Sequence, residues 1–309
     1  MTEAAALPPT IKVLERGWLS ANNILLKGSN GAALVDSGYV THAPQTVALV
    51  RHALGETPLA RLINTHCHAD HMGGNVALQR EFGCRTSIPV EEAPLIERWD
   101  EHALLLSYAD QRAEQFSFDD TFAPGDTLQL GDLEWRVLAA PGHDPYATMF
   151  FAPDARILIS GDALWEDGFG VLFPMLFGRA TTFAEARATL EAIAALDAAI
   201  VIPGHGRVFS DIDAALERAF SRLRGFEVDI GRLARHCARV MLTFALLERR
   251  RMPLARLTGY VEEIPILRDL NRRFFNWAPE RYAAWLVEEL ERLRALEREG
   301  DQIVPRIAA

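Results

Sequence analysis

Three histidines and one aspartate stand within six consecutive residues, in segment 66–71, which reads HCHADH. Imidazole nitrogens and carboxylate oxygens are donors that hold Zn²⁺ and related metal ions in proteins. Alternate side chains of an extended backbone point the same way, so His66 and His68 can face one point. Asp70 and His71 follow where the chain turns toward a helix, and they can face a second point nearby. Because burying so many polar rings without a partner costs free energy, the segment predicts a metal site.

Three single residues further along the chain are candidate ligands of the same kind. Each stands just after an expected strand: His143 after 134–139, Asp162 after 156–160, and His205 after 199–202. Alone, a Gly-His or Gly-Asp pair at the end of a strand is a weak signal. Together and in this order, downstream of the histidine-rich segment, the residues form a specific set.

This set resembles the HxHxDH signature and the later single ligands of the metallo-β-lactamase superfamily, over about residues 10–210. The resemblance implies a four-layer αββα sandwich with two divalent metal ions. Zn²⁺ is the foremost candidate, and Fe and Mn²⁺ suit similar donors. The resemblance assigns His66, His68 and His143 to one ion. It assigns Asp70, His71 and His205 to the other, with Asp162 bridging the two. The family's early acidic position corresponds to Asp36, whose implied role is to support the ligand loop.

Such a pair of ions indicates hydrolysis. A water bound to Zn²⁺ has a pKa of roughly 7, so a metal-bound hydroxide is available to attack an ester-type carbonyl. No serine or cysteine nucleophile is required, and Cys67, between two ligands, is expected to pack. Asp70 is expected to help orient the hydroxide as well. Tyr146 is a further catalytic candidate, as a hydrogen-bond donor to the carbonyl or leaving group, with plain packing as the alternative. Gly73 and Gly74 are expected to let the backbone turn tightly behind the ligands.

The elements that must position these residues alternate in the first two thirds of the chain. Expected strands at 11–14, 23–27 and 32–35 are followed by helices and strands interleaved up to residue 202, including a mostly helical stretch at 91–115. This alternation predicts an α/β or α+β layered domain. After residue 210 only helices are expected, at 214–223, 230–250, 266–275 and 279–298. We therefore expect a catalytic domain at 1–210 and an all-helical C-terminal cap at 211–309.

The end of the chain resembles the winged-helix-like tails of one branch of the superfamily, near the animal β-lactamase-like protein 2 and related thioesterases. Glyoxalase II also has a helical C-terminal region, which covers its active site. These resemblances leave three roles open for the tail, namely substrate binding, dimerisation to a homodimer, or a structural cap. Segment 163–178 is rich in apolar residues and broken by glycine and proline. It is expected either to join the core or to form a hydrophobic wall over the metals.

Composition restricts the partners. A formal net charge of −10 argues against nucleic acid and anionic membranes. Three scattered cysteines do not make a disulfide framework, and no run approaches the ~18 apolar residues of a membrane span. With no signal-peptide pattern at the start, the expected location is the cytoplasm. The expected partner is a small molecule with an acyl or apolar part. Arg207 is expected to pair either with an anionic substrate group or with a neighbouring acid.

The leading functional prediction is hydrolysis of a thioester, carried by coenzyme A, an acyl carrier or glutathione, or of a lactone. A metal-dependent nuclease and a redox member of the superfamily are the main alternatives. A β-lactam hydrolase is less favoured, because secretion would be expected of one. A non-catalytic binding protein that keeps the motif is a further alternative.

Overall fold

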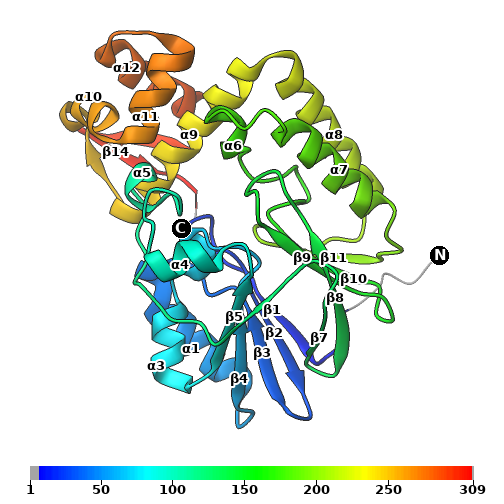
Figure 1. Ribbon diagram of the computed structural model, residues 1–309. Helices are drawn as coiled ribbons and strands as arrows, with labels where there is room; N and C mark the ends of the chain where they lie inside the picture. Colours follow the sequence, from blue (N-terminus) through cyan, green and yellow to red (C-terminus); the bar gives the residue numbers. More distant parts are fainter. Residues whose placement is uncertain (1–6, 308–309) are drawn as a thin grey trace.

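Two β-sheets face one another in the computed structural model, which describes residues 7–307 (Figure 1). The first sheet has the order β1-β2-β3-β4-β5-β6 and comprises β1 (Ile11–Leu14), β2 (Asn23–Gly28), β3 (Gly31–Val35), β4 (Leu59–Ile63), β5 (Arg85–Pro89) and β6 (Asp120–Phe122). The second has the order β11-β10-β9-β8-β7 and comprises β7 (Thr127–Leu130), β8 (Leu133–Ala139), β9 (Thr148–Ala152), β10 (Ile157–Gly161) and β11 (Ile200–Pro203).

Successive side chains of a strand point to opposite faces of the sheet, and this alternation explains how the layers pack. In β2, Ile24 and Leu26 face inward to a core shared with the second sheet, whereas Leu25 faces the opposite way. The outward side chains pack against α1 (Ala43–Leu54) and α3 (Asn75–Phe82), and α2 (Ala69–Met72) lies just before α3. The outer face of the second sheet packs against α7 (Thr182–Ala194), which in turn contacts α8 (Ile212–Val228). This is the expected four-layer sandwich.

The C-terminal region contains helices together with a small antiparallel sheet. Its elements are α9 (Ile230–Arg249), β12 (Met252–Pro253), α10 (Leu254–Glu263), α11 (Pro265–Leu270), the short π-helix η2 (Asn271–Phe275), α12 (Pro279–Arg292), β13 (Leu296–Glu299) and β14 (Gln302–Pro305). The sheet has the order β12-β14-β13, so the region is mainly helical but not all-helical as expected. Its resemblance to winged-helix-like tails stays a prediction. One continuous core joins this region to the outer face of the second sheet. The division of the chain at residue 210 stays a prediction.

Residues 293–299 differ from the expected closing helix. The helix α12 ends at Arg292, Arg294 adopts a left-handed backbone with φ 56°, and the chain then forms β13. β13 pairs with β14 through a two-residue turn at Gly300-Asp301, where Gly300 has φ 65°. Glutamate, arginine and leucine favour a helix locally, but the pairing with β14 and the burial of Leu296 override that preference.

Segment 91–115 is not mostly helical, and this prediction was wrong. Only α4 (Ala93–Arg98) and α5 (Leu106–Ala109) are helical within it. Trp99, Leu105 and Asp110 all have positive φ, so each short helix begins or ends at a left-handed residue. Leu104 in this segment and Phe116 just after it lie on irregular backbone, and their side chains are buried in a core that also contains Cys67 of the histidine-rich loop.

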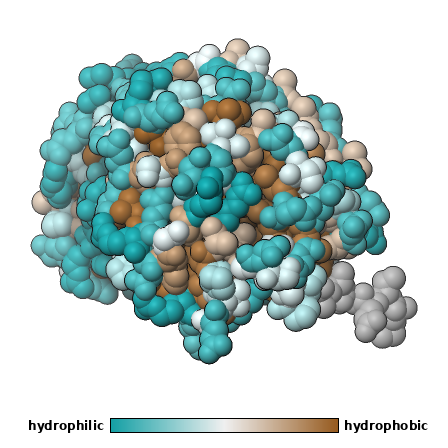
Figure 2. Space-filling view, turned by 60° about the horizontal axis from the view of Figure 1, so that its bottom comes forward, coloured by the Kyte–Doolittle hydropathy of each residue, from teal (hydrophilic) through white to brown (hydrophobic). Residues whose placement is uncertain are grey.

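The surface has hydrophobic side chains scattered among hydrophilic ones on the face shown in Figure 2. Within residues 7–307, none of the helices has both the length and the apolar character needed to span a bilayer.

Candidate metal centre and its cavity

The ends of strands from both sheets bring the seven predicted ligands together. Asp162 directly follows β10, His205 lies two residues after β11, and the histidine-rich loop follows β4. The buried donor atoms form three groups, and within each group the atoms lie within 4.8 Å of one another. They are His66, His68 and His143; His66, His71 and Asp162; and Asp70, His71 and His205.

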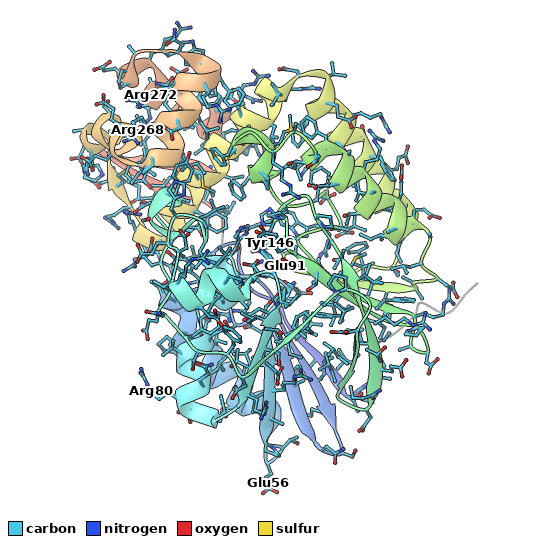
Figure 3. The ribbon with its side chains drawn as sticks, in the orientation of Figure 1. Glu56, Arg80, Glu91, Tyr146, Arg268 and Arg272 are labelled. Carbon is cyan, nitrogen blue, oxygen red and sulfur yellow. The ribbon has the colours of Figure 1, made fainter. Side chains whose placement is uncertain are left out.

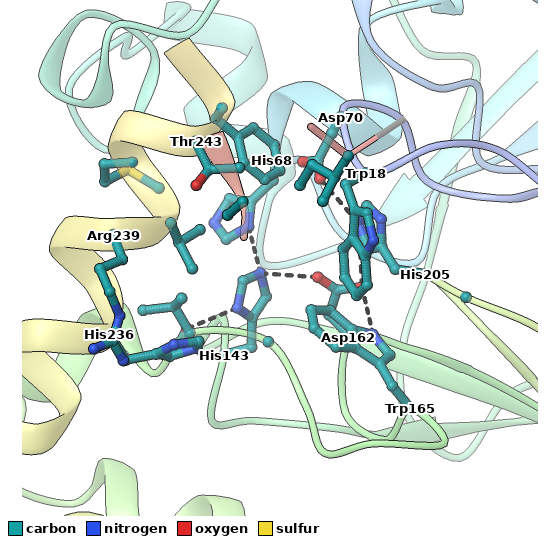
Figure 4. Close-up of a pocket in the computed structure, with 18 of the residues that line it drawn as sticks. Trp18, His68, Asp70, His143, Asp162, Trp165, His205, His236, Arg239 and Thr243 are labelled. Atoms are coloured by element: carbon teal, nitrogen blue, oxygen red, sulfur yellow. Dashed lines mark hydrogen bonds and ion pairs between the residues drawn. The ribbon is translucent and has the colours of Figure 1, made fainter. Parts of the chain in front are cut away.

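The first group is a set of three converging imidazole nitrogens, of which those of His68 and His143 are seen in Figure 4. The Nδ1 atom of His68 lies 3.1 Å from Nε2 of His66 and 2.8 Å from Nε2 of His143. The Nδ1–H of His143 donates to the backbone carbonyl of Val171 at 2.7 Å. Because a carbonyl only accepts, this bond places the proton on Nδ1 and leaves the lone pair of Nε2 directed at the other two rings.

The second group combines a carboxylate with two imidazoles. The Nε2 atom of His205 lies 3.1 Å from Oδ2 of Asp70. His71 donates its Nδ1–H to Asp36 at 2.8 Å, and its buried Nε2 has no hydrogen-bond partner within residues 7–307. A buried nitrogen without a partner is costly, and a bound cation would remove that cost.

Asp162 lies between the two groups. Its Oδ2 atom is 3.4 Å from Nε2 of His143, in the first group. Its Oδ1 atom is 3.4 Å from Nε2 of His71 and 3.9 Å from Nε2 of His205, in the second. One carboxylate oxygen therefore faces each group.

Burial and charge set the protonation of these donors. Burial, with His143 acting in the same direction, lowers the pKa of His68 to about 3, and it lowers the pKa of His66 well below the usual value. Burial alone would raise the pKa of Asp162, but His71 and His205 hold it well below its ordinary value. Neutral imidazoles and an ionised carboxylate are the forms that ligate metal ions, so His66, His68 and Asp162 are in the forms that fit a cation.

Asp36 supports the loop from behind, as expected. Its side chain is buried and accepts hydrogen bonds from the backbone N–H and the Oγ1–H of Thr65, both at 2.9 Å, besides the one from His71. Asp36 has φ 58°, a conformation that is unfavourable for a residue other than glycine. These contacts hold the strained residue in place and orient the His71 ring.

Two acids that the sequence reasoning missed contact the ligand loop. The Oδ2 atom of Asp144 is 3.6 Å from Nε2 of His68, and Glu92 accepts from the backbone N–H of Cys67 at 3.3 Å. Burial, reinforced by Asp144, raises the pKa of Glu92 well above its usual value. Nothing in the local sequence around Glu92 marks it, because it reaches the site from a different loop.

Several glycines near the ligands are required because a side chain at their positions would collide with neighbouring atoms. A Cβ on Gly204 would lie 2.3 Å from Oδ1 of Asp162, and one on Gly170 would lie 2.5 Å from Nδ1 of His143. Gly73, expected to give a tight turn, has an ordinary helical φ of −62°. It is required because a Cβ there would lie 2.4 Å from the backbone nitrogen of Val40.

A cavity of about 560 Å³ opens over this centre. Its floor carries His68, Asp70, His143, Asp162 and His205, and apolar side chains line the walls, among them Leu105, Val171, Phe173, Met241, Phe244 and Leu290. Helix α9 forms the opposite wall, with His236, Arg239 and Thr243 directed toward the cavity (Figure 4). The C-terminal region therefore completes the pocket.

Two tryptophans flank His205. Trp18 stacks on its ring with centroids 5.6 Å apart, and Trp165 meets it edge-on at 5.3 Å. The indole N–H of Trp165 also donates to Asp162 at 3.3 Å. Sequence reasoning missed Trp18, since a single tryptophan in a loop carries no local signal for a site.

The remaining sequence-based expectations have mixed outcomes. Segment 163–178 serves both expected roles, because Leu164 and Leu176 join the core while Val171 and Phe173 line the cavity. Cys67 is buried among apolar side chains, and burial raises the pKa of its thiol, so packing is its role.

Two side chains proposed to contact the substrate are exposed. Tyr146, on the loop between β8 and β9 (Figure 3), is exposed and is not among the residues that line the cavity. Its catalytic role stays a prediction. Arg207 lies at the cavity, with its guanidinium 3.9 Å from Glu166 and its side chain 79% exposed. It is free to contact either an acid or a substrate.

Residues 16–205 match the family model of the metallo-beta-lactamase superfamily, and the chain belongs to this superfamily. The predicted family and fold are confirmed. The superfamily typically binds two metal ions, and the clusters described above fit that pattern.

Among curated relatives, the hydroxyacylglutathione hydrolase of Rhodospirillum rubrum is 26% identical over 232 residues, covering 73% of this chain and 79% of that enzyme. The hydroxyacylglutathione hydrolase of Rhizobium etli is 30% identical over 115 residues, which span 37% of this chain and only 38% of that enzyme. Both relatives are hydrolases, in agreement with the predicted enzyme class. A solved metallo-beta-lactamase family protein from Thermus thermophilus shares the fold, with a TM-score of 0.57 and 22% identity over 97% of this chain and 100% of that one.

Proposed function

We propose that this chain is a metal-dependent hydrolase of thioesters whose acyl part is apolar. One observation carries the proposal: the buried donor groups lie on the floor of a cavity whose walls are mostly apolar side chains from α9 and segment 163–178. An apolar pocket with a few convergent polar groups is typical of a small-molecule site. The similarity to hydroxyacylglutathione hydrolases supports a thioester as the bond that is cleaved.

The proposed ligands are His66, His68 and His143 for one ion, and Asp70, His71 and His205 for the other, with Asp162 between them. When bound, the ions would supply a Lewis acid for the substrate carbonyl and would lower the pKa of water at the site. Zn²⁺ is our choice of metal, because imidazole and carboxylate donors suit it.

The protein's own side chains then fix the geometry. The Asp36 carboxylate and the Val171 carbonyl each accept a hydrogen bond from the Nδ1–H of a ligand histidine, so both rings keep the orientation that the ions require. Trp18 and Trp165 pack against the ring of His205 and limit its movement. We propose that Asp70, on the cavity floor, also orients the attacking water by accepting its hydrogen bond.

The cavity suits an acyl chain that lies along α9. Met241, Phe244 and Leu290 extend the apolar wall away from the ligands toward the C-terminal region. Burying each CH₂ of a substrate there would contribute about 0.8 kcal/mol, so longer acyl chains would bind more tightly. The thiolate released from a thioester needs little help from a general acid, consistent with the exposed position of Tyr146.

A substrate panel on metal-analysed protein tests the proposal. It contains acetyl and octanoyl thioesters of N-acetylcysteamine, the matching lactones, and a phosphodiester. We expect thioester turnover with kcat/KM higher for the octanoyl ester. Asp162→Asn should lose this activity, while Asp213→Asn, an exposed carboxylate on α8, should keep it. Cleavage of the phosphodiester without thioester turnover would replace the proposal with a nuclease.

A further inference from the structure

A second cavity, of about 720 Å³, adjoins the first and is lined mainly by residues of α8 and α9. The two cavities share Asp167, Arg222, His236 and Arg239 in their linings. A ligand that enters over the proposed metal centre therefore has a continuation on the far side of these residues. The walls of the second cavity differ from those of the first in being strongly charged.

The charge of the second cavity is mainly positive. Its lining includes four arginines, Arg218, Arg222, Arg232 and Arg239, against two acids, Asp167 and Glu217. Arg218 lies 3.4 Å from Asp167, and Arg239 pairs with Glu289 at 2.9 Å. Neither Arg222 nor Arg232 has a carboxylate within 4.0 Å anywhere in residues 7–307. In a chain with a net charge of −10, a concave surface with more guanidinium groups than carboxylates in its lining indicates an anionic ligand.

Arg222 is held in place for such a role. Its guanidinium lies 6.0 Å from the centre of the Phe169 ring, and a Cβ on Gly168 would lie 2.4 Å from its Nη1 atom. The loop after Asp162 therefore leaves room for this one cation. Burial lowers the pKa of Arg222, and Arg222 and Arg239 add to burial in lowering the pKa of His236 to about 3. The first effect shows that the Arg222 guanidinium is partly desolvated, and the second shows that two guanidinium groups act on the same buried place, where a bound anion would be favourable.

We infer that Arg222 and Arg232, with Arg239, bind the phosphate of the thiol that carries the acyl group, so the substrate is a thioester of a phosphate-bearing pantetheine. This inference rests on the proposed function and names its substrate class. The thiol lies at the proposed metal centre, the acyl chain lies along the apolar wall, and the phosphate reaches the second cavity. Guanidinium groups suit this task, because their planar donors bind phosphate oxygens in pairs.

Direct binding to the metal-loaded protein tests the inference without turnover. Calorimetry would compare coenzyme A with pantetheine, which lacks phosphate, and with glutathione, which carries carboxylates instead. We expect coenzyme A to bind more tightly than pantetheine, with a preference that weakens as salt concentration increases. Arg222→Gln should reduce the ratio of the two affinities about tenfold, and Arg222→Lys should reduce it less. Arg224→Gln, an exposed position on the same helix that lines neither cavity, should leave the ratio unchanged.

Free coenzyme A and an acyl-carrier domain with the same phosphopantetheine arm are the two sources of this chemistry. Titration with each, in turn, identifies the source by the lower Kd. Equal affinities for coenzyme A and pantetheine in the wild-type protein at low salt would overturn the inference, as would tighter, Arg222-dependent binding of glutathione. Both results leave thioester hydrolysis intact. A protein that binds coenzyme A through Arg222 but cleaves no thioester would refute the proposed function alone.

Discussion

Asp36 illustrates how much a single residue behind the ligands contributes. It accepts one hydrogen bond from the Nδ1–H of His71 and two from Thr65 while adopting a left-handed backbone. We expect Asp36→Ala to lower metal affinity at the His71 site by about 10- to 100-fold, because the ring loses its orienting acceptor. Competition with a chromophoric chelator measures this change. An unchanged affinity would show that Asp36 acts only on the backbone turn.

Gly204 offers a second test at the residue scale, since a Cβ there would lie 2.3 Å from Oδ1 of Asp162. Gly204→Ala must displace the carboxylate that faces both donor groups, so we expect the protein to lose at least one metal equivalent and most of its activity. Gly259→Ala is the control, because its nearest contact is the flexible end of Arg256. It replaces a glycine within α10 and should stabilise the helix by about 0.5–1 kcal/mol. Metal analysis and thermal unfolding distinguish the two variants.

Helix α12 carries a prediction at the scale of the element. The hydroxyl of Tyr282 is buried and has no hydrogen-bond partner within residues 7–307, although the ring stacks on Trp285. Tyr260 on α10 is the matched residue, because its hydroxyl donates to Asp110 at 2.7 Å. We expect Tyr282→Phe to raise the free energy of unfolding by about 1 kcal/mol, and Tyr260→Phe to lower it by a similar amount. Denaturant titration of both variants gives the comparison, and a destabilised Tyr282→Phe would reveal an undetected partner of that hydroxyl.

Two elements departed from their local preference, and both departures have a tertiary cause. Residues 296–299 are good helix formers that become a strand because β14 supplies their backbone partners. Segment 91–115 breaks into two short helices because its buried side chains must reach the core beside the ligand loop. By contrast, the ten expected strands all lie within a few residues of their predicted positions, although β6 and the three C-terminal strands were not expected. Short runs of buried β-branched and aliphatic residues between turn signals identified the expected strands.

Considered as a whole molecule, the protein should depend on its metals for stability. The ligands come from both sheets, so a bound pair of ions would link segments that are distant in the chain. Ligands that bind only the folded state stabilise it by about 4 kcal/mol at a thousandfold excess over Kd. We therefore expect removal of the metals by a chelator to lower Tm by several degrees, with recovery on addition of Zn²⁺. Differential scanning calorimetry of the two forms checks this, and identical Tm values would contradict it.

Metal affinity at the His71 site should also depend on pH. Burial opposes protonation of His71, yet Asp36, Asp162 and Asp70 raise its pKa well above the usual value, so the metal-free protein holds a proton there. Metal binding must displace that proton. Affinity at this site should therefore increase with pH up to the raised pKa and fall as the pH decreases below it. Calorimetric titrations in buffers with different ionisation enthalpies measure the proton released, and uptake of a proton would refute the assignment.

The types and order of the candidate ligands were determined by the sequence alone. HCHADH and three residues at strand ends were sufficient for the superfamily and the four-layer fold, because strand periodicity and a dense donor motif are local properties. The pairing of atoms across the centre was decided only by the tertiary structure. The positions of Trp18 on His205, of Glu92 against the backbone of Cys67, and of Arg222 in the lining of two cavities were also decided there. These contacts join loops from different layers, and no local pattern encodes which distant side chain completes a pocket.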